Sequence, residues 1–383
     1  MRHALRLAAR AAGETNPNPL VGCVIVRGGR VVGEGAHVRA GEAHAESVAL
    51  EAAGAAARGA TLYVNLEPCS HHGRTPPCAP RVAAAGVKRV VVALCDPNPR
   101  VDGRGLALLL RAGVRVQTGV LAAEAALLNE RFLVAARERR PFVLLKAALT
   151  LDGRIATARR ESKWITSARD RAAARRLRRL HDGVLVGIGT VLADDPLLLP
   201  SPRTRRPFHR IVLDSRLRLP PDSRLLRGAP RDPVWLLTTS RHARRRMALE
   251  EAGARVLVAP SRAGRVPLRW ALRHLFAEGL WSLMVEGGAE TLGSFLAAGL
   301  FDQVVLFRAT LLLGGRGSLS AFGGPDPGSL ASARALAPSL APETVRGGEF
   351  DLVRSLCRAA GPLAEVWYPD HGPSPRASGH PRG

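Results

Sequence analysis

Short apolar segments that end near glycine or proline alternate along the chain with longer stretches rich in alanine and leucine. Short apolar runs bounded by such residues are typical of buried strands, and longer stretches that mix apolar and charged positions are typical of helices. Regular alternation of the two predicts an α/β protein.

The first part of the chain predicts a hairpin followed by alternating helices and strands. Segments 21–26 and 30–35 flank Gly28-Gly29, and a glycine pair between two strands indicates a tight β-turn. Further strands are predicted at 61–66, 90–94 and 114–118, with helices at 44–58, after Cys78, at 106–111 and after the last strand.

A charged run at 137–140 precedes Pro141, and a new apolar segment begins at Phe142. We therefore predict a first domain over residues 1–140 and a second over 141–369, which suits a chain of 383 residues. Residues 370–383 carry no apolar face, and we expect a disordered tail there. The strands predicted in the second domain are 142–148, 183–187, 210–213, 234–238, 256–259, 280–286 and 303–307.

Composition places the chain among globular proteins, with 46% hydrophobic and 23% charged residues. No apolar run approaches the roughly 18 residues that cross a bilayer. The five cysteines are an odd number in a chain without a secretory signal, which argues against disulfides. We expect a cytoplasmic protein.

The charge balance bears on the partners of the protein. It has 56 basic and 32 acidic residues, a net charge of +24, which by itself would favour nucleic acid or an anionic membrane. Arginine supplies nearly all of this charge and is spread over the whole chain, and the 4% of aromatic residues offer little surface for stacking bases. We expect a dispersed basic surface that attracts a phosphorylated small molecule, without a nucleic-acid or membrane partner.

Three residues from separate parts of the first domain form a candidate zinc site. His44 opens a predicted helix, Cys69 follows a strand, and Cys78 begins the next helix. Three protein ligands leave the fourth position of zinc to a water molecule, which zinc activates near pH 7. Glu46, two residues after the histidine, is suited to carry the proton of that water to a leaving amine.

His-x-Glu followed by Pro-Cys and a second cysteine is the general signature of zinc-dependent base deaminases. The usual gap between the two cysteines is two residues, whereas here residues 70–77 intervene. From the signature and the charge alone, a nucleic-acid-editing deaminase remains an alternative, as does a basic nucleic-acid-binding protein with structural zinc.

The long segment between the cysteines, the run 16–22 and the run 96–99 make this region similar to the deaminase half of the bifunctional pyrimidine deaminase/reductase of riboflavin biosynthesis. The resemblance implies a cytidine-deaminase-like three-layer domain in which His44, Cys69 and Cys78 hold Zn²⁺ and Glu46 is catalytic. It implies hydrolytic deamination of 2,5-diamino-6-ribosylamino-4(3H)-pyrimidinone 5′-phosphate. The positions that match the substrate pocket of the family are Asn18, His37, His71, Arg74, Asp96 and Asn98.

In the second domain, Glu286-Gly287-Gly288 follows a predicted strand and opens a helix, where backbone N–H groups can receive a pyrophosphate. No Gly-x-Gly-x-x-Gly motif follows the first strand of this domain, so the usual dinucleotide fold is not expected. The order and spacing of runs 146–156, 161–167, 186–196, 213–215 and 285–292 resemble the reductase half of the same family.

That resemblance implies a dihydrofolate-reductase-like fold, NADPH as cofactor, and reduction of the ribosyl group of the deaminated product to ribityl. It also implies two groups of binding residues. The cofactor group is Ala148, Trp164, Thr190, Asp194, Ser215, Gly288, Ala289, Glu290, Thr291, Leu292, Gly293 and Ser294. The substrate group is Lys146, Ser162, Arg178, Leu198 and Glu286.

One departure concerns the substrate phosphate. The family continues Asp-Pro into a Leu-Thr-x-Arg stretch whose arginine binds phosphate, and this chain has Leu-Leu-Pro-Ser at 198–201 instead. We expect Arg203 to take over the contact. We also expect a homo-oligomer.

Overall fold

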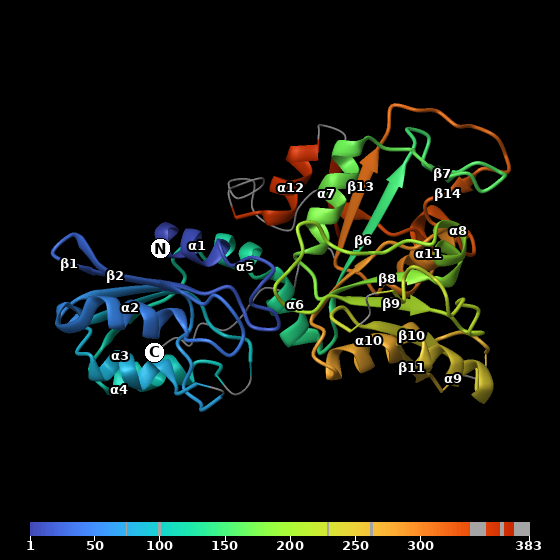
Figure 1. Cartoon of the computed structure of the whole chain (residues 1–383). Helices are drawn as coiled ribbons and strands as arrows, with labels where there is room; N and C mark the ends of the chain where they lie inside the picture. Colours follow the sequence, from blue (N-terminus) through green and yellow to red (C-terminus); the bar gives the residue numbers. More distant parts are fainter. Residues whose placement is uncertain are drawn as a thin grey trace.

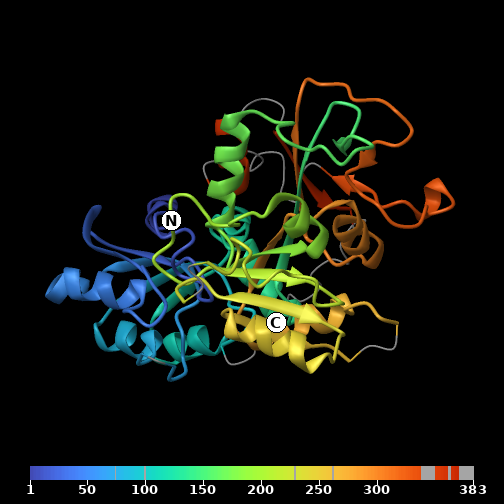
Figure 2. The ribbon, with the colours of Figure 1, turned by 45° about the vertical axis from the view of Figure 1, so that its right-hand side comes forward.

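The computed structural model describes residues 1–73, 75–98, 101–227, 230–260, 263–337, 350–360 and 364–370. Its longer strands form two separate sheets, each with helices against both faces (Figure 1). Figure 2 shows the same arrangement from a second side, with the first sheet and its helices next to the larger second sheet. This architecture confirms the predicted α/β class. In the described part of the chain, no helix is long and apolar enough to cross a membrane.

The first sheet has five strands in the order β2-β1-β3-β4-β5. β1 is antiparallel to β2 and β3, whereas β3, β4 and β5 are parallel. The carboxyl ends of the three parallel strands therefore meet at one edge, where sites are commonly built. The strands are β1 (Gly22–Arg27), β2 (Arg30–Ala36), β3 (Thr61–Leu66), β4 (Arg89–Leu94) and β5 (Arg115–Gln117).

Helices cover both faces of this sheet, which gives the three layers expected for the first domain. On β4, Val92 packs in one cluster with residues of α2, α3 and α4, and its neighbour Ala93 packs with residues of α1 and α5 on the opposite face. Successive strand residues point to opposite faces, so an all-apolar strand serves both layers. The helices are α1 (Arg2–Ala9), α2 (Ala45–Ala53), η1 (Gly54–Ala57), α3 (Cys78–Ala84), α4 (Arg104–Arg111), α5 (Ala122–Leu128) and α6 (Glu130–Glu138).

Two glycines of β2 set the position of α2. A Cβ atom at Gly33 would lie 2.3 Å from the carbonyl oxygen of Ala49, and one at Gly35 would lie 2.5 Å from that of Ala45. Only glycine allows the helix to approach the strand this closely. The close approach fixes the first turn of α2, which carries His44 as its N-cap and Glu46.

The second sheet has nine strands in the order β11-β10-β9-β8-β12-β6-β13-β16-β15. The strands from β11 to β13 are parallel, and β16 pairs antiparallel with β13 and β15. A separate ribbon joins β7 (Arg154–Ala156) and β14 (Leu319–Ser320). The strands of the sheet are β6 (Phe142–Leu149), β8 (Gly183–Gly187), β9 (His209–Leu213), β10 (Val234–Thr238), β11 (Ala254–Val258), β12 (Ser282–Val285), β13 (Gln303–Arg308), β15 (Leu336–Ala337) and β16 (Ala364–Pro369).

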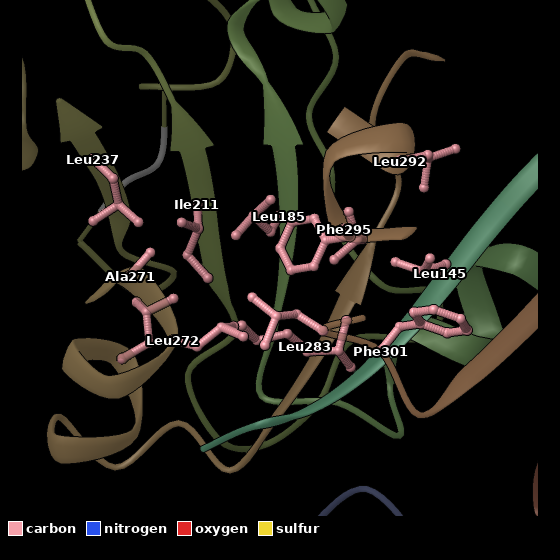
Figure 3. Packing of buried hydrophobic residues seen from close by; sticks show 14 of the residues in the cluster. Leu145, Leu185, Ile211, Leu237, Ala271, Leu272, Leu283, Leu292, Phe295 and Phe301 are labelled. Carbon is pink, nitrogen blue, oxygen red and sulfur yellow. The ribbon is translucent and has the colours of Figure 1, made fainter. Parts of the chain in front are cut away.

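Buried side chains fill both faces of the second sheet. On one face, Leu185, Ile211 and Leu283 pack against Leu272 of α10 and Phe295 of α11 (Figure 3). On the other face, residues of α7 and α12 pack around β6 and β13, and residues of α8 and α9 pack around β8 to β10. The helices are α7 (Ala168–Arg178), α8 (Ile188–Asp194), α9 (Ala243–Glu251), α10 (Leu268–Ala277), α11 (Ala289–Ala298), η2 (Leu330–Ser332) and α12 (Leu352–Ala360).

The structure differs from the expected elements in a few places. The helix predicted at 44–58 ends at Ala53, because Gly54 has φ of 50° and the chain continues as a 3₁₀ turn. The single helix expected after the fifth strand is divided into α5 and α6 at Asn129. The expected tail at 370–383 lies outside the described residues except for Asp370, whose backbone N–H donates to the carbonyl of Ala335.

Candidate active sites

Three elements of the first unit bring His44, Cys69 and Cys78 together. His44 caps α2, Cys69 lies just beyond β3, and Cys78 is the first residue of α3. Nδ1 of His44 lies 3.5 Å from Sγ of Cys69 and 3.4 Å from Sγ of Cys78. All three donor atoms lie within 4.8 Å of one another. Tetrahedral zinc with usual Zn–N and Zn–S bonds separates such atoms by about 3.5 Å, so these residues fit a Zn²⁺ ion.

The neighbours of the three ligands prepare them for a metal. Thr75 Oγ1 lies 3.1 Å from Nε2 of His44, so the other ring nitrogen, Nδ1, faces the two sulfurs. A hydrogen bond from Cys78, supported by His44 and by the first N–H group of α3, lowers the pKa of the Cys69 thiol. These contacts favour the thiolate, the form that binds metal.

Glu46 is 4% exposed and lies in the same cavity as His44 and Cys69. Burial raises the pKa of its carboxyl group to about 7. A carboxyl group with such a pKa can take up and release a proton near neutral pH. The group is not needed to complete the set of three metal ligands, so it is free for proton transfer.

The cavity has a volume of about 410 Å³, the size of a small-molecule site. Five residues predicted to contact the deaminase substrate line it. They are Asn18, His37, His71, Asp96 and Asn98. The sixth, Arg74, lies outside the described residues.

Hydrogen bonds orient two of these side chains. Nδ1 of His37 lies 3.1 Å from the carbonyl oxygen of Ala43, and Nε2 lies 3.0 Å from Nδ2 of Asn18. A carbonyl only accepts and an amide nitrogen only donates, so the ring of His37 carries its proton on Nδ1. Burial lowers the pKa of His37, which agrees with a neutral ring. This arrangement leaves the amide oxygen of Asn18 to accept a hydrogen bond from a ligand.

The sequence analysis did not identify an acidic residue and two aromatic residues of this site. The carboxylate of Glu67 accepts hydrogen bonds from the backbone N–H groups of Asp96, Gly103, Gly105 and Leu106, and so fastens the loop that presents Asp96. The position of Glu67 directly before Pro68-Cys69 could have identified it as part of the site. Phe132 of α6 and Trp281, which precedes β12 of the second sheet, also line the cavity. No local pattern marks either aromatic residue for this role.

A second site lies at the carboxyl ends of β6 and β12. Both oxygens of Glu286 face Arg178, at 2.5 Å from Nε and 3.1 Å from Nη2, and Lys146 Nζ lies 3.2 Å from Oε2. Burial would raise the pKa of Glu286, but Arg178 and Lys146 outweigh burial and hold it at about 2. One ionised carboxylate thus fixes two cations in the interior.

Two cavities meet at this ion pair. One of about 790 Å³ and one of about 890 Å³ share Ile155, Ser162, Thr190, Asp194 and Glu286 as lining residues. The first runs along the start of α11, where the N–H group of Gly288 donates to Thr190 Oγ1 over 3.1 Å. A Cβ atom at Gly287 would lie 2.5 Å from Cβ of Thr291, so glycine is needed at this turn. A backbone turn at a helix N-terminus suits the phosphates of a dinucleotide.

The predicted cofactor residues fall into three groups. Those that line the 790 Å³ cavity are Thr190, Asp194, Ser215, Gly288, Ala289, Glu290, Thr291 and Ser294. Ala148 and Trp164 line the 890 Å³ cavity instead. Leu292 and Gly293 line neither: Leu292 is buried in the core, and a Cβ atom at Gly293 would lie 1.7 Å from the carbonyl oxygen of Gly323.

Of the six residues predicted to bind the reductase substrate, five line one cavity and one does not. Lys146, Ser162, Arg178, Leu198 and Glu286 all line the 890 Å³ cavity. Arg203 does not; its guanidinium pairs with Asp232, which also accepts the N–H group of Phe208. Arg203 is therefore held apart from the residues that it was expected to join.

Two different protein families match the two parts of the chain. The family model of the RibD C-terminal domain matches residues 141–340, and the model of the cytidine and deoxycytidylate deaminase zinc-binding region matches residues 1–94. The chain is 44% identical to the riboflavin biosynthesis protein RibD of Bacillus amyloliquefaciens over 82% of its own length and 85% of that protein. It is 43% identical to RibD of Escherichia coli over 82% of its length and 88% of that protein.

Solved structures give the same result. The structure of the chain is similar to that of Acinetobacter baumannii RibD, with a TM-score of 0.78 and 38% identity, covering 88% of this chain and 92% of that one. It is also similar to a diaminohydroxyphosphoribosylaminopyrimidine deaminase/5-amino-6-(5-phosphoribosylamino)uracil reductase of Thermotoga maritima, with a TM-score of 0.78 and 32% identity over 96% of this chain and 97% of that one.

Proposed function

Because this chain belongs to the RibD family and is a bifunctional deaminase and reductase of riboflavin biosynthesis, we propose that it acts on one phosphorylated pyrimidine in two consecutive steps. The first step removes the ring amine of 2,5-diamino-6-ribosylamino-4(3H)-pyrimidinone 5′-phosphate and releases ammonia. The second reduces the ribosyl group of the product to ribityl with NADPH. The similar Thermotoga maritima protein is named as both a deaminase and a reductase, which supports this assignment.

In the deaminase site, His44, Cys69 and Cys78 would hold zinc, which would supply a Lewis acid and an activated water. The carboxylate of Glu46 would take up a proton and deliver a proton to the departing amine. Asn18 and His37 present hydrogen-bonding groups whose orientation is already fixed, and His71, Asp96 and Asn98 complete the polar wall. Arg74 remains a proposed contact to the substrate.

In the reductase site, NADPH would supply the hydride, and the protein holds the cofactor and the substrate in position for its transfer. The turn at Gly288 and the start of α11 would receive the cofactor phosphates, with Thr190, Asp194 and Ser215 lining the same cavity. Ala148 and Trp164 line the 890 Å³ cavity and would contact the cofactor from the substrate side. Glu286 holds Arg178 and Lys146 in place beside the reacting carbon, with Ser162 and Leu198 completing the wall.

One observation carries the proposal. Three metal donors within 4.8 Å of one another adjoin a buried carboxylate in a cavity of about 410 Å³. A cavity of this size suits a single small molecule, and the same constellation would be unnecessary for a closed structural zinc site, where a fourth protein ligand is usual.

The test is a stepwise assay with purified protein. We expect ammonia from the diaminopyrimidinone phosphate in the absence of NADPH, and NADPH oxidation once the deaminated product is present. Binding to RNA that falls steeply with salt, together with no ammonia release, would instead favour a nucleic-acid-binding protein.

Three further proposals concern the domain boundary, the location in the cell and the oligomeric state. We place the division between the two functional units at residues 140 and 141, between the described helix α6 and strand β6. We propose that the enzyme is cytoplasmic, where its phosphorylated substrate is retained. We propose a homo-oligomer, which sedimentation of the purified protein tests directly.

A further inference from the structure

One face of α7 directs three arginines toward the 890 Å³ cavity. Arg171, Arg175 and Arg178 are spaced four and three residues apart, a spacing that places side chains on the same side of a helix. All three line the cavity, together with Lys146, Lys163 and Arg224. The cavity therefore receives much of its positive charge from a single helix.

The three arginines differ in what they already bind. Arg178 is neutralised by Glu286, and its Nη1 atom donates to the carbonyl of Leu199 over 2.8 Å. Arg171 donates to the carbonyl of Thr166 over 2.6 Å, and its guanidinium carbon lies 4.2 Å from the ring centre of Trp164. In the part of the chain that the structure describes, neither Arg171 nor Arg175 forms an ion pair with a carboxylate.

The other carboxylates that line the cavity bind partners other than Arg171 and Arg175. Asp194 pairs with Lys163 at 3.2 Å, and Asp195 accepts the backbone N–H group of Arg224 at 2.8 Å. Asp170 accepts the N–H group of Ser167 at 3.0 Å in the capping box of α7. Among the described residues, no carboxylate forms an ion pair with Arg171 or Arg175, so both bring positive charge to the cavity wall, which favours an anionic ligand there.

The segment 197–201, which lies against α7, supplies no cation to the cavity. Residues 197–201 line the cavity as leucines, a proline and Ser201, and the N–H group of Ser201 donates to the carbonyl of Arg175 over 3.2 Å. This contact places the end of the segment beside the middle of α7. Arg203, two residues further along, is paired with Asp232 away from the cavity.

The spacing along α7 also fits the length of the substrate. With a rise of 1.5 Å per residue, Arg175 lies about 4.5 Å and Arg171 about 10 Å along the helix from Arg178. The extended ribosyl chain from C1′ to phosphorus covers six bonds, about 7 Å. If the ribosyl chain extends along α7 from a carbon held near Glu286 and Arg178, its phosphate lies between Arg175 and Arg171.

We propose that Arg175, with Arg171 beside it, binds the 5′-phosphate of the reductase substrate in this protein. The proposal rests on the reductase function proposed above and assigns to α7 the phosphate contact that was expected from Arg203. Two guanidinium groups without counterions match a phosphate in charge and in hydrogen-bonding geometry. Trp164 keeps Arg171 in position by stacking, so its guanidinium is ordered before the phosphate arrives.

The experiment compares Arg175→Ala with Arg176→Ala in the full-length enzyme. Arg176 is the next residue of the same helix, has the same charge, is exposed and does not line the cavity. NADPH oxidation is measured with the deaminated substrate, with and without its phosphate. We expect Arg175→Ala to lower kcat/KM for the phosphorylated substrate about 10-fold to 100-fold, mainly through KM, since hydrogen bonds between charged groups have this weight. We expect less than twofold change with the dephosphorylated substrate, and recovery of part of the loss in Arg175→Lys.

A second readout uses inorganic phosphate as the competing ligand. Its inhibition constant against the phosphorylated substrate should rise in Arg175→Ala and remain unchanged in Arg176→Ala. Ammonia release by the same preparation reports whether the variant is folded.

The outcomes separate this proposal from the function on which it rests. If the wild-type enzyme does not oxidise NADPH with the deaminated substrate, the proposed reductase function is wrong and this assignment falls with it. If the wild-type enzyme is active and Arg175→Ala behaves like Arg176→Ala, or loses equal activity on both substrates, only the phosphate assignment is overturned.

Discussion

The indole of Trp281 stacks on the ring of Phe132, with centroids 5.6 Å apart and planes at 14°. Trp281 precedes β12 of the second sheet, and Phe132 belongs to α6, the last helix of the first unit, yet both line the deaminase cavity. Trp281 also contacts Phe276 of α10 at 5.3 Å between ring centres. The reductase half thus supplies part of the wall of the deaminase site.

We predict that Trp281→Ala weakens deamination although the substitution lies outside the deaminase domain. Loss of the stacked pair should lower kcat/KM for ammonia release about threefold to tenfold, the usual weight of an aromatic pair. Reduction of the separately supplied deaminated substrate should keep its KM. Steady-state assays of both steps measure the two effects.

Trp270→Ala is the matched control for this prediction. Trp270 of α10 stacks on His274 and packs against the core of the second sheet, away from the deaminase cavity. If both tryptophan variants lose ammonia release equally, general damage to the second domain explains the loss and Trp281 has no special place in the pocket.

The two active sites differ in how far the sequence could predict them. His44, Glu46, Cys69 and Cys78 were identifiable because the chemistry of zinc restricts the residue types and their local order. The structure brings them together at the edge where parallel strands end, as the order of strands and helices required. Trp281 could not be identified, since its role depends on how the two units are packed.

Arg203 shows a second limit. Arg203 was predicted because it follows closely, in the sequence, the position where the family has its phosphate-binding arginine. In the structure, its guanidinium instead pairs with the buried carboxylate of Asp232. Arg175 lies one turn of α7 before Arg178, and only the helix packing shows that both arginines face one cavity. Among the elements, β16 was missed because its six residues form a strand only by adding to the edge of β13.

Removal of zinc should separate the two activities. We predict that Cys69→Ser loses both the metal and ammonia release, because a hydroxyl group is a far weaker zinc ligand than a thiolate. Reduction of supplied deaminated substrate should persist, since the second site lies on the other sheet. Zinc content is measured by atomic emission, and ammonia release and NADPH oxidation are assayed in the same proteins. Cys357→Ser is the control. Cys357 is buried in α12, and parallel loss of zinc in that variant would contradict the assignment.

The ion pair of Glu286 gives a pH-dependent stability. Its pKa in the folded protein is about 2, below the ordinary value of 4.5. The carboxylate therefore stabilises the fold fully above pH 4.5, and this contribution is lost as the pH falls from 4.5 toward 2. We predict that Glu286→Gln lowers the free energy of unfolding by about 3 kcal/mol at pH 7, and that the difference from the wild type shrinks between pH 4.5 and 3.

Urea titrations at pH 7, 4.5 and 3 test this prediction, with Glu250→Gln as control. Glu250 pairs with Arg246 on the exposed surface of α9, where an ion pair contributes at most about 1 kcal/mol. A difference for Glu286→Gln that stays constant down to pH 3 would mean that its carboxylate is not held by Arg178 and Lys146 in the way described.

If Glu46 moves protons beside a zinc ion held by three side chains, bound zinc and ammonia release should respond differently to Glu46→Gln. Both are measured in the wild type and in this variant. We expect one zinc ion per chain in both proteins, a loss of ammonia release of about 10²-fold or more in the variant, and unchanged NADPH oxidation with supplied deaminated substrate. Ammonia release that survives in a zinc-loaded Glu46→Gln enzyme would contradict this role of Glu46.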